Sequence, residues 1–163
     1  MKRTPILFLT QAAAVAALYV ALTYLSFLLG LANGAVQLRL SEALCVLPFL
    51  TPAAVPGLFV GCLLANLLTG CAPWDILLGS LATLAGAAGC RALRHQSPYL
   101  AALPTIAANT AVIPPVLQWV YGVEGALPLL FLTVGAGEVL SCGVLGTLLL
   151  LTLRKKRFPW LSY

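Results

Sequence analysis

Charged side chains are scarce in this sequence: they make up 8% of the residues, whereas hydrophobic residues make up 61%. Soluble domains carry about 25% charged residues, so this composition cannot cover a surface that faces water. A helix needs roughly 20 apolar residues to span a bilayer, so a chain of 163 residues holds about five or six spans. The sequence therefore predicts a single all-α integral membrane domain over residues 1–163, with no separate soluble domain.

Catalytic sequence motifs are also nearly absent. The sequence has one histidine, His95, and contains neither a G-x-S-x-G nucleophile motif nor a histidine pair spaced for a metal. It has no G-x-x-x-x-G-K-[ST] phosphate loop, so the chain cannot use ATP by itself. The five cysteines are scattered without a C-x-x-C pair, which argues against structural zinc and against a disulfide framework. We therefore predict a protein that is not an enzyme and has no metal site and no cofactor.

The net charge of +5 could suggest nucleic-acid binding, but the positions of the basic residues argue against that partner. All but one of the nine lie in three groups beside apolar runs: Lys2 and Arg3; Arg91 and Arg94; Arg154, Lys155, Lys156 and Arg157. The positive-inside rule makes these three groups cytoplasmic. The predicted topology therefore has both termini in the cytoplasm. The loops around Arg39, Asp75 and Glu124 then lie outside.

Apolar runs and proline or glycine punctuation divide the chain into six predicted helices. These cover residues 5–30, 41–50, 53–68, 74–90, 99–120 and 126–153. The first run is too long for the apolar core of a signal peptide, so we expect a retained first span. The second helix is too short to span without tilting or continuing through the bend at Pro52 and Pro56. Pro73 ahead of Asp75 is typical of a helix start.

The first helix carries small residues at helical spacing. Ala13, Ala17 and Ala21 share one face, with Ala12 and Ala16 next to it. Small residues at this spacing let a second helix approach closely in lipid. The pattern alone leaves two readings open, namely packing within this chain and contact with a partner subunit.

Two polar residues are predicted at the depth of the hydrocarbon layer. Glu138 lies about 18 Å below the start of its helix, near the middle of a layer roughly 30 Å thick. Asn109 is about as deep when counted from the other side. A carboxyl at that depth is costly and indicates a functional site. The alternatives are a packing glutamate that is protonated or bonded to a serine such as Ser141 and, for Asn109, a single hydrogen bond between helices.

A second polar set is predicted at the outer ends of the helices. It comprises Gln37, Arg39, Glu42, Asn66, Trp74, Asp75, Gln118, Trp119 and Tyr121. Several of these residues also have a purely structural interpretation. The tryptophans can be aromatic residues of the membrane interface, Asp75 can stabilise a helix start, and Arg39 can form an ion pair with Glu42. The alternative is that the set and Glu138 ring a cavity that opens outward. Donors, acceptors and flat aromatic faces suit a small planar polar molecule.

Two segments carry a resemblance to a known family. VQLRLSEALCVLPFLTPAAVPGLFVGCLLANLLTG (36–70) and WDILLGSLATLAGA (74–87), together with the alanine-rich first helix, resemble the QueT family. Members of this family are substrate-binding S components of energy-coupling factor (ECF) transporters and import queuosine precursors in bacteria. The resemblance implies a multi-pass protein of the bacterial cell membrane. It also implies an outward cavity that is covered by the loop between the first two helices.

The resemblance further implies a partner and a mechanism. S components dock on a module of one membrane coupling subunit and two ATPase subunits, and an A-x-x-x-A pattern in the first helix forms the docking face. That pattern is present here as Ala12/Ala16, Ala13/Ala17 and Ala17/Ala21. The S component then topples in the membrane and carries its cavity inward.

The ligand implied is pre-queuosine (7-aminomethyl-7-deazaguanine) or queuine. We expect Glu138 or Glu42 to read the guanine edge and Asp75 to face the ammonium group. Asn109, Gln37 or Arg39 would donate to the ligand carbonyl, and Trp119 or Trp74 would stack on the ring; Gln118 and Asn66 complete the predicted set. The alternatives are an S component for another vitamin or nucleobase, a membrane enzyme, and a passive pore or structural subunit.

Overall fold

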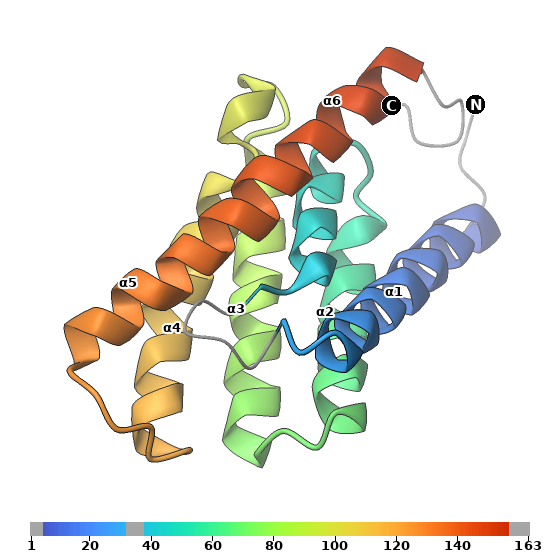
Figure 1. The fold of residues 1–163 in the computed structure, drawn as a ribbon. Coiled ribbons are helices and arrows are strands. Elements are labelled where there is room, and N and C mark those ends of the chain that lie inside the picture. Colours follow the sequence, from blue (N-terminus) through green and yellow to red (C-terminus); the bar gives the residue numbers. More distant parts are fainter. Residues whose placement is uncertain (1–4, 32–37, 157–163) are drawn as a thin grey trace.

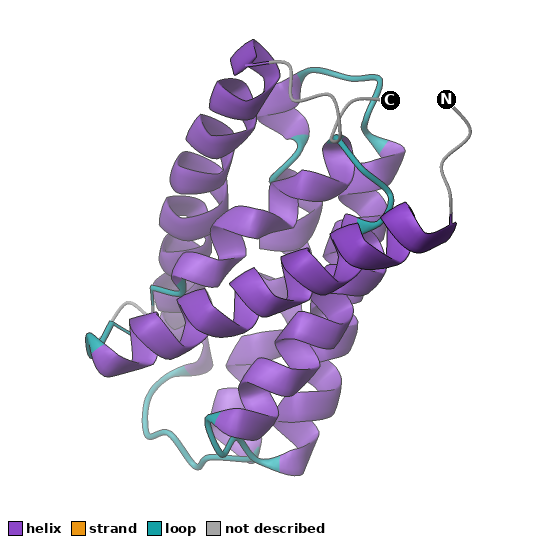
Figure 2. Cartoon of the chain, turned by 90° about the vertical axis from the view of Figure 1, so that its right-hand side faces the viewer, coloured by secondary structure: helices purple, strands orange, loops and turns teal. Residues whose placement is uncertain are grey.

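The structure, a computed structural model, describes residues 5–31 and 38–156. Within these ranges all regular structure is helical (Figure 2). The elements are α1 (Pro5–Leu28), the 3₁₀ helix η1 (Leu40–Phe49), α2 (Ala54–Leu68), α3 (Pro73–Ala92), the short 3₁₀ helix η2 (Pro98–Leu100), α4 (Leu103–Trp119), α5 (Leu127–Glu138), the π-helix η3 (Val139–Gly146) and α6 (Thr147–Lys156). The six helical segments predicted from the sequence are confirmed to within a few residues.

The helices form one bundle around η1 (Figure 1). α3 packs between α2 and α4, and α1 packs on α2. α5, η3 and α6 run as one long rod across the bundle, and η3 rests on η1. η1 also contacts α1 and α3, and its Cys45 and Val46 have no exposed surface. The second helical segment is therefore a central element and not an outer one.

The second segment is a 3₁₀ helix, whereas the sequence indicated only a short helix. Pro48 lies inside it and has no N–H to donate, which removes one α-helical hydrogen bond. The first turn of η1 is stabilised by hydrogen bonds to side chains of α1. Ser26 Oγ accepts from the Leu40 N–H at 2.9 Å. Thr23 Oγ1 donates to Ser41 Oγ at 2.8 Å. Side chains of α1 thus fix where η1 begins.

Two glycines of α2 bring α1 unusually close. A Cβ on Gly57 would lie 2.6 Å from the carbonyl oxygen of Ala12, and one on Gly61 would lie 3.0 Å from Cα of Ala16. Ala12 and Ala16 are therefore packed within the chain, and the structure does not place them on the exposed face that a partner would meet. Ala13, Ala17 and Ala21 are exposed. The predicted docking face is thereby narrowed to these three alanines.

This close approach gives a stability prediction. We expect Gly57→Ala to lower the thermal midpoint of the purified protein, because the added methyl must displace the α1 backbone. Overpacking of this kind costs about 1–3 kcal/mol. Gly143→Ala is the control, since its Cβ would meet only ordinary contacts, the nearest being Cδ1 of Ile106 at 3.5 Å. Equal midpoints for the two variants in a melting assay would contradict this account of the α1–α2 contact.

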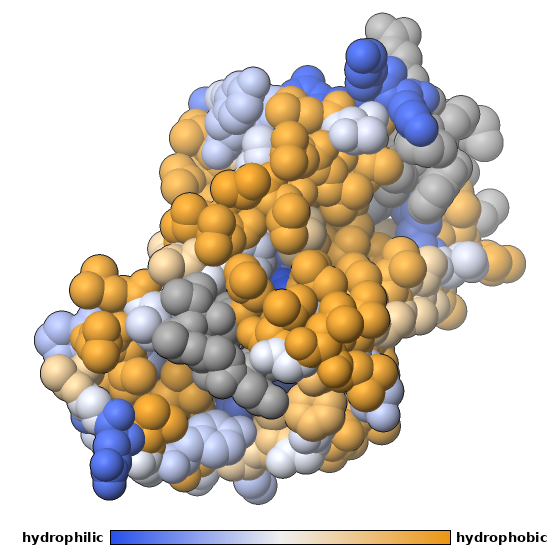
Figure 3. Space-filling view, in the orientation of Figure 1, coloured by the Kyte–Doolittle hydropathy of each residue, from blue (hydrophilic) through white to orange (hydrophobic). Residues whose placement is uncertain are grey.

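The surface of the bundle is strongly apolar. Figure 3 shows hydrophobic residues over most of one face, with hydrophilic residues gathered toward the two ends. Within the described residues three segments are long and apolar enough to cross a membrane, namely Pro5–Leu28, Pro98–Trp119 and Leu127–Lys156. Leu40–Phe49 and Ala54–Leu68 are shorter apolar helices. The number of spans and the orientation of the termini remain predictions.

Candidate functional site

Glu42 lies at the centre of a buried polar cluster and is 2% exposed. Its Oε1 accepts from the Tyr19 hydroxyl at 2.5 Å. Its Oε2 accepts from Cys45 Sγ at 3.1 Å and from Asn109 Nδ2 at 3.3 Å. Three elements, α1, η1 and α4, thus converge on this carboxyl group. Both of its oxygens have donors from the chain itself.

Glu138, at the end of α5, is less well satisfied. Its Oε1 accepts from Asn109 Nδ2 at 3.0 Å, so one amide group serves both carboxyls. Among the described residues its Oε2 has no hydrogen-bond partner, and neither has Oδ1 of Asn109 or Oγ of Ser141. The alternative reading of Glu138 as a glutamate bonded to Ser141 is therefore wrong in this structure.

The orientation of the Asn109 amide follows from its neighbours. The Nδ2 group of Asn109 faces both carboxyl groups, and its carbonyl oxygen Oδ1 has no partner among the described residues. The sequence reading in which Asn109 donates to a ligand carbonyl needs a correction, because its donors are already engaged. The free atom of Asn109 is an acceptor.

Close packing of η1 and η3 brings the two carboxyl groups together. A Cβ on Gly146 would lie 2.9 Å from Cγ1 of Val46 and 3.2 Å from the carbonyl oxygen of Ala43. The π-helix begins directly after Glu138, and π segments frequently occur at functional sites. Both Glu42 and Glu138 therefore face the same interior space.

Two compartments that share one lining residue, Arg39, lie inside the bundle. The inner compartment has a volume of about 20 Å³. It is lined by Arg39, Glu42, Cys62, Gly79, Thr83, Asn109, Ile113, Val134 and Glu138. The outer compartment has a volume of about 310 Å³. It is lined by Thr23, Ser26, Phe27, Arg39, Asn66, Thr69, Cys71, Asp75, Leu117, Tyr121 and Val123.

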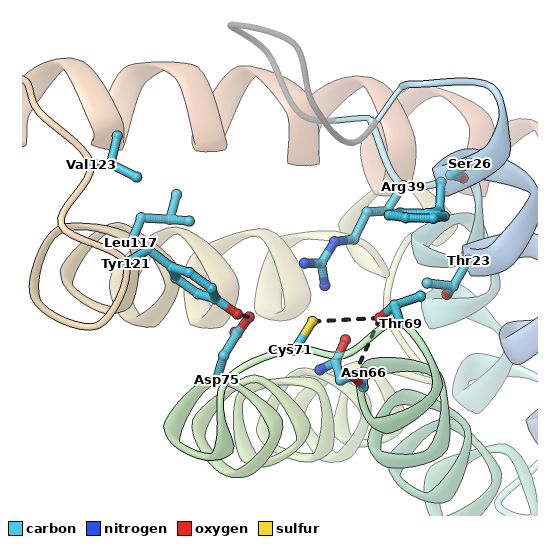
Figure 4. A pocket seen from close by; sticks show the side chains of 11 residues that line it. Thr23, Ser26, Arg39, Asn66, Thr69, Cys71, Asp75, Leu117, Tyr121 and Val123 are labelled. Atoms are coloured by element: carbon cyan, nitrogen blue, oxygen red, sulfur yellow. Dashed lines mark hydrogen bonds between the residues drawn. The ribbon is translucent and has the colours of Figure 1, made fainter.

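The outer compartment holds opposite charges on opposing walls (Figure 4). The Arg39 guanidinium points into it from one wall, and Asp75 and Tyr121 face it from another. Within the described part of the chain the Arg39 and Glu42 side chains form no ion pair. The interpretation of these two residues as a structural ion pair is therefore wrong. The Arg39 guanidinium instead points into the outer compartment.

Tyr121 joins the ends of α3 and α4 at this site. Its hydroxyl donates to Asp75 Oδ2 at 2.8 Å and accepts from the Ala72 N–H at 3.0 Å. Partial burial and the neighbouring Asp75 raise the pKa of this phenol above its usual value, so it stays protonated and keeps donating. Asp75 is thus more than a helix-start residue, since its side chain forms part of the cavity wall.

The structure brings six of the predicted site residues onto the two compartments: Arg39, Glu42, Asn66, Asp75, Asn109 and Glu138. Trp74 and Trp119 lie elsewhere, at 63% and 77% exposed, along an apolar groove of about 510 Å³ between α3 and α4. The stacking role predicted for them is not supported by this position. Gln118 Nε2 donates to the Gly125 carbonyl and lines neither compartment. Gln37 lies outside the described residues.

Tyr19 is the main residue that sequence reasoning missed. It is buried on the face of α1 that also carries Gln11, Thr23 and Ser26. Tyr19, Thr23 and Ser26 follow one another at intervals of four and three positions, and Gln11 lies eight positions before Tyr19, which places all four on one helix face. That signal was present in the sequence but was obscured by the alanines, which dominate the neighbouring face.

The arrangement can bind a polar molecule, since a guanidinium, an amide and carboxyl groups converge in a space enclosed by apolar helices. No metal-binding group of three or more histidine, cysteine or acidic side chains occurs among the described residues. Long apolar helices around an internal polar cavity define the class of helical membrane proteins.

Comparison with known proteins makes this class more specific. The family model described as QueT transporter matches residues 9–155, which is most of the chain. The chain therefore belongs to the QueT transporter family and is a membrane transport protein. Searches of curated proteins and of solved structures gave no match.

Proposed function

We propose that the chain is the substrate-binding S component of an ECF importer and that it binds a queuosine precursor in the two-compartment cavity. The observation that carries this proposal is the cavity itself: buried carboxyl groups and the half-buried Arg39 guanidinium line two adjoining compartments inside an apolar bundle. A chain without a phosphate loop needs partner ATPases to drive uptake. The proposed energising module supplies one coupling subunit and two ATPase subunits.

The cavity suits a deazaguanine chemically. A volume of about 310 Å³ lies at the small end of the range for ligand pockets. A guanine-type ring offers a carbonyl that needs a donor, which Arg39 provides, and N–H groups that need acceptors, which the carboxyls provide. The aminomethyl group of pre-queuosine is a cation and fits a site with three acidic side chains, Glu42, Asp75 and Glu138.

Docking is proposed to use α1. Its exposed alanines Ala13, Ala17 and Ala21 leave a shallow face on which a partner helix can pack closely. The cavity would be loaded outside, and toppling of the docked subunit would carry it to the cytoplasmic side. Both termini are then cytoplasmic.

Uptake of labelled pre-queuosine tests the proposal in cells that lack their own route for it. We expect ATP-dependent accumulation when the chain and an ECF module are expressed together, and none with either alone. Accumulation of a different vitamin or nucleobase instead would keep the S-component role and replace the ligand. Uptake by the chain alone would contradict the coupling to an ATPase module.

The position of the tryptophans gives a second prediction. Trp119→Ala should leave the dissociation constant for pre-queuosine within about twofold, because Trp119 lies on the apolar groove between α3 and α4 and lines neither compartment of the cavity. Isothermal titration of the purified variant measures this. A tenfold loss of affinity with unchanged folding would return the stacking role to this residue.

A further inference from the structure

We infer that the inner compartment is the binding site for an amino group, held by Glu138 Oε2 and Asn109 Oδ1. The inference rests on the proposed function and assigns one part of the ligand to one part of the cavity. It also distinguishes between the two glutamates that the sequence left as equal candidates.

Hydrogen-bond saturation separates the two glutamates. Glu42 accepts three hydrogen bonds from the chain, from Tyr19, Cys45 and Asn109. Glu138 accepts one, and its Oε2 is buried without a partner among the described residues. A buried carboxylate oxygen without a donor is unfavourable, so Glu138 is the group that gains most from a ligand donor.

The second orphaned acceptor lies on the adjoining side chain. Asn109 is 4% exposed, its Oδ1 also lacks a partner, and its amide is fixed by the two carboxyl groups. Both residues line the inner compartment. Two neighbouring acceptors without a partner suit a group that carries at least two N–H or O–H bonds, and an amino group is the one that the proposed ligand offers.

Size restricts what that group can be. A cavity needs roughly 10–15 Å³ to hold one water molecule, so a compartment of about 20 Å³ has room for a small polar group and is far smaller than the outer compartment of about 310 Å³. An amino group has that size and carries two or three N–H bonds. The ring would then lie in the outer compartment, which shares the lining residue Arg39 with the inner one.

Pre-queuosine has two such groups, the 2-amino group on the ring and the aminomethyl substituent. Three probes separate them in titrations of the purified chain: pre-queuosine, 7-deazaguanine without the aminomethyl group, and the analogue without the 2-amino group. We expect one of the two truncated probes to bind the wild-type protein at least about 30-fold more weakly than pre-queuosine. The probe that loses affinity identifies the group in the inner compartment.

Glu138→Met supplies the decisive comparison, since it keeps the length of the side chain and removes both acceptors. The affinity difference between pre-queuosine and the sensitive probe should shrink to less than about threefold in this variant. Trp119→Ala, which lies outside the cavity, should retain the full difference and serves as the control for folding and detergent effects.

The outcomes distinguish the inference from the proposed function. Equal binding of all three probes by the wild-type protein would overturn the inference alone, as would an undiminished difference in Glu138→Met. Failure of folded wild-type protein to bind any of the three would overturn the proposed ligand and the inference with it.

Discussion

Glu138→Gln is expected to weaken binding of pre-queuosine by about 100-fold or more while the empty protein keeps or gains thermal stability. Losing a charged partner from a buried hydrogen-bonded pair costs about 2–5 kcal/mol of binding free energy. In the empty protein, however, the same carboxyl carries an oxygen without a donor, which itself costs about 1–3 kcal/mol. An amide at this position can donate to Asn109 Oδ1 and remove that cost.

Glu42→Gln is the matched comparison and should behave in the opposite way. Glu42 accepts from Tyr19, Cys45 and Asn109, and a glutamine has only one carbonyl oxygen to replace two carboxylate oxygens. We therefore expect its melting temperature to fall. Thermal melts and calorimetric titrations of both variants test the pair of predictions. A loss of stability in Glu138→Gln that equals the loss in Glu42→Gln would contradict the division between a ligand-binding and a structural glutamate.

Bulky substitution of the exposed alanines should abolish uptake and spare ligand binding. Ala13→Leu and Ala17→Leu place larger side chains on the exposed face of α1, away from the cavity and from α2. A partner helix can no longer approach closely, so we expect uptake to fall at least about tenfold. The dissociation constant of the isolated chain should stay within about twofold.

Two further substitutions control for this effect. Ala85→Leu changes an exposed alanine of α3 by the same number of atoms and should leave uptake unchanged. Ala16→Leu enlarges a residue that packs against Gly61 and should impair folding, uptake and binding together. Normal uptake by Ala17→Leu, with the expected failure of Ala16→Leu, would show that the exposed face of α1 is not where the module docks.

Much of the fold follows from the sequence because apolar length and proline spacing determine where helices begin and end. The position of Glu138 and Asn109 deep inside the bundle was also predictable, because a polar residue in the middle of a long apolar segment lies at the depth of the hydrocarbon layer, where it is energetically costly. Depth does not determine which face of a helix a residue occupies, however. For that reason Trp74 and Trp119 were assigned to the site from their depth along the helix alone. The structure places both on the apolar groove between α3 and α4.

Helix packing was the other property that the sequence left open. The five alanines of the predicted docking pattern divide between two faces of the first helix, and the close approach of Gly57 and Gly61 on α2 covers one of these faces. The G-x-x-x-G spacing of these two residues was a usable signal for an internal contact at Ala12 and Ala16. The central position of η1 had no comparable signal, because it depends on contacts with α1, α3 and η3 together.

The central claim is that the polar cavity binds a queuosine precursor, and calorimetric titration of the purified, folded chain tests it most directly. Pre-queuosine, queuine, guanine and a panel of vitamins would be titrated under the same conditions. The account predicts tight and selective binding of a deazaguanine. Absence of deazaguanine binding, together with tight binding of a different vitamin, would contradict it.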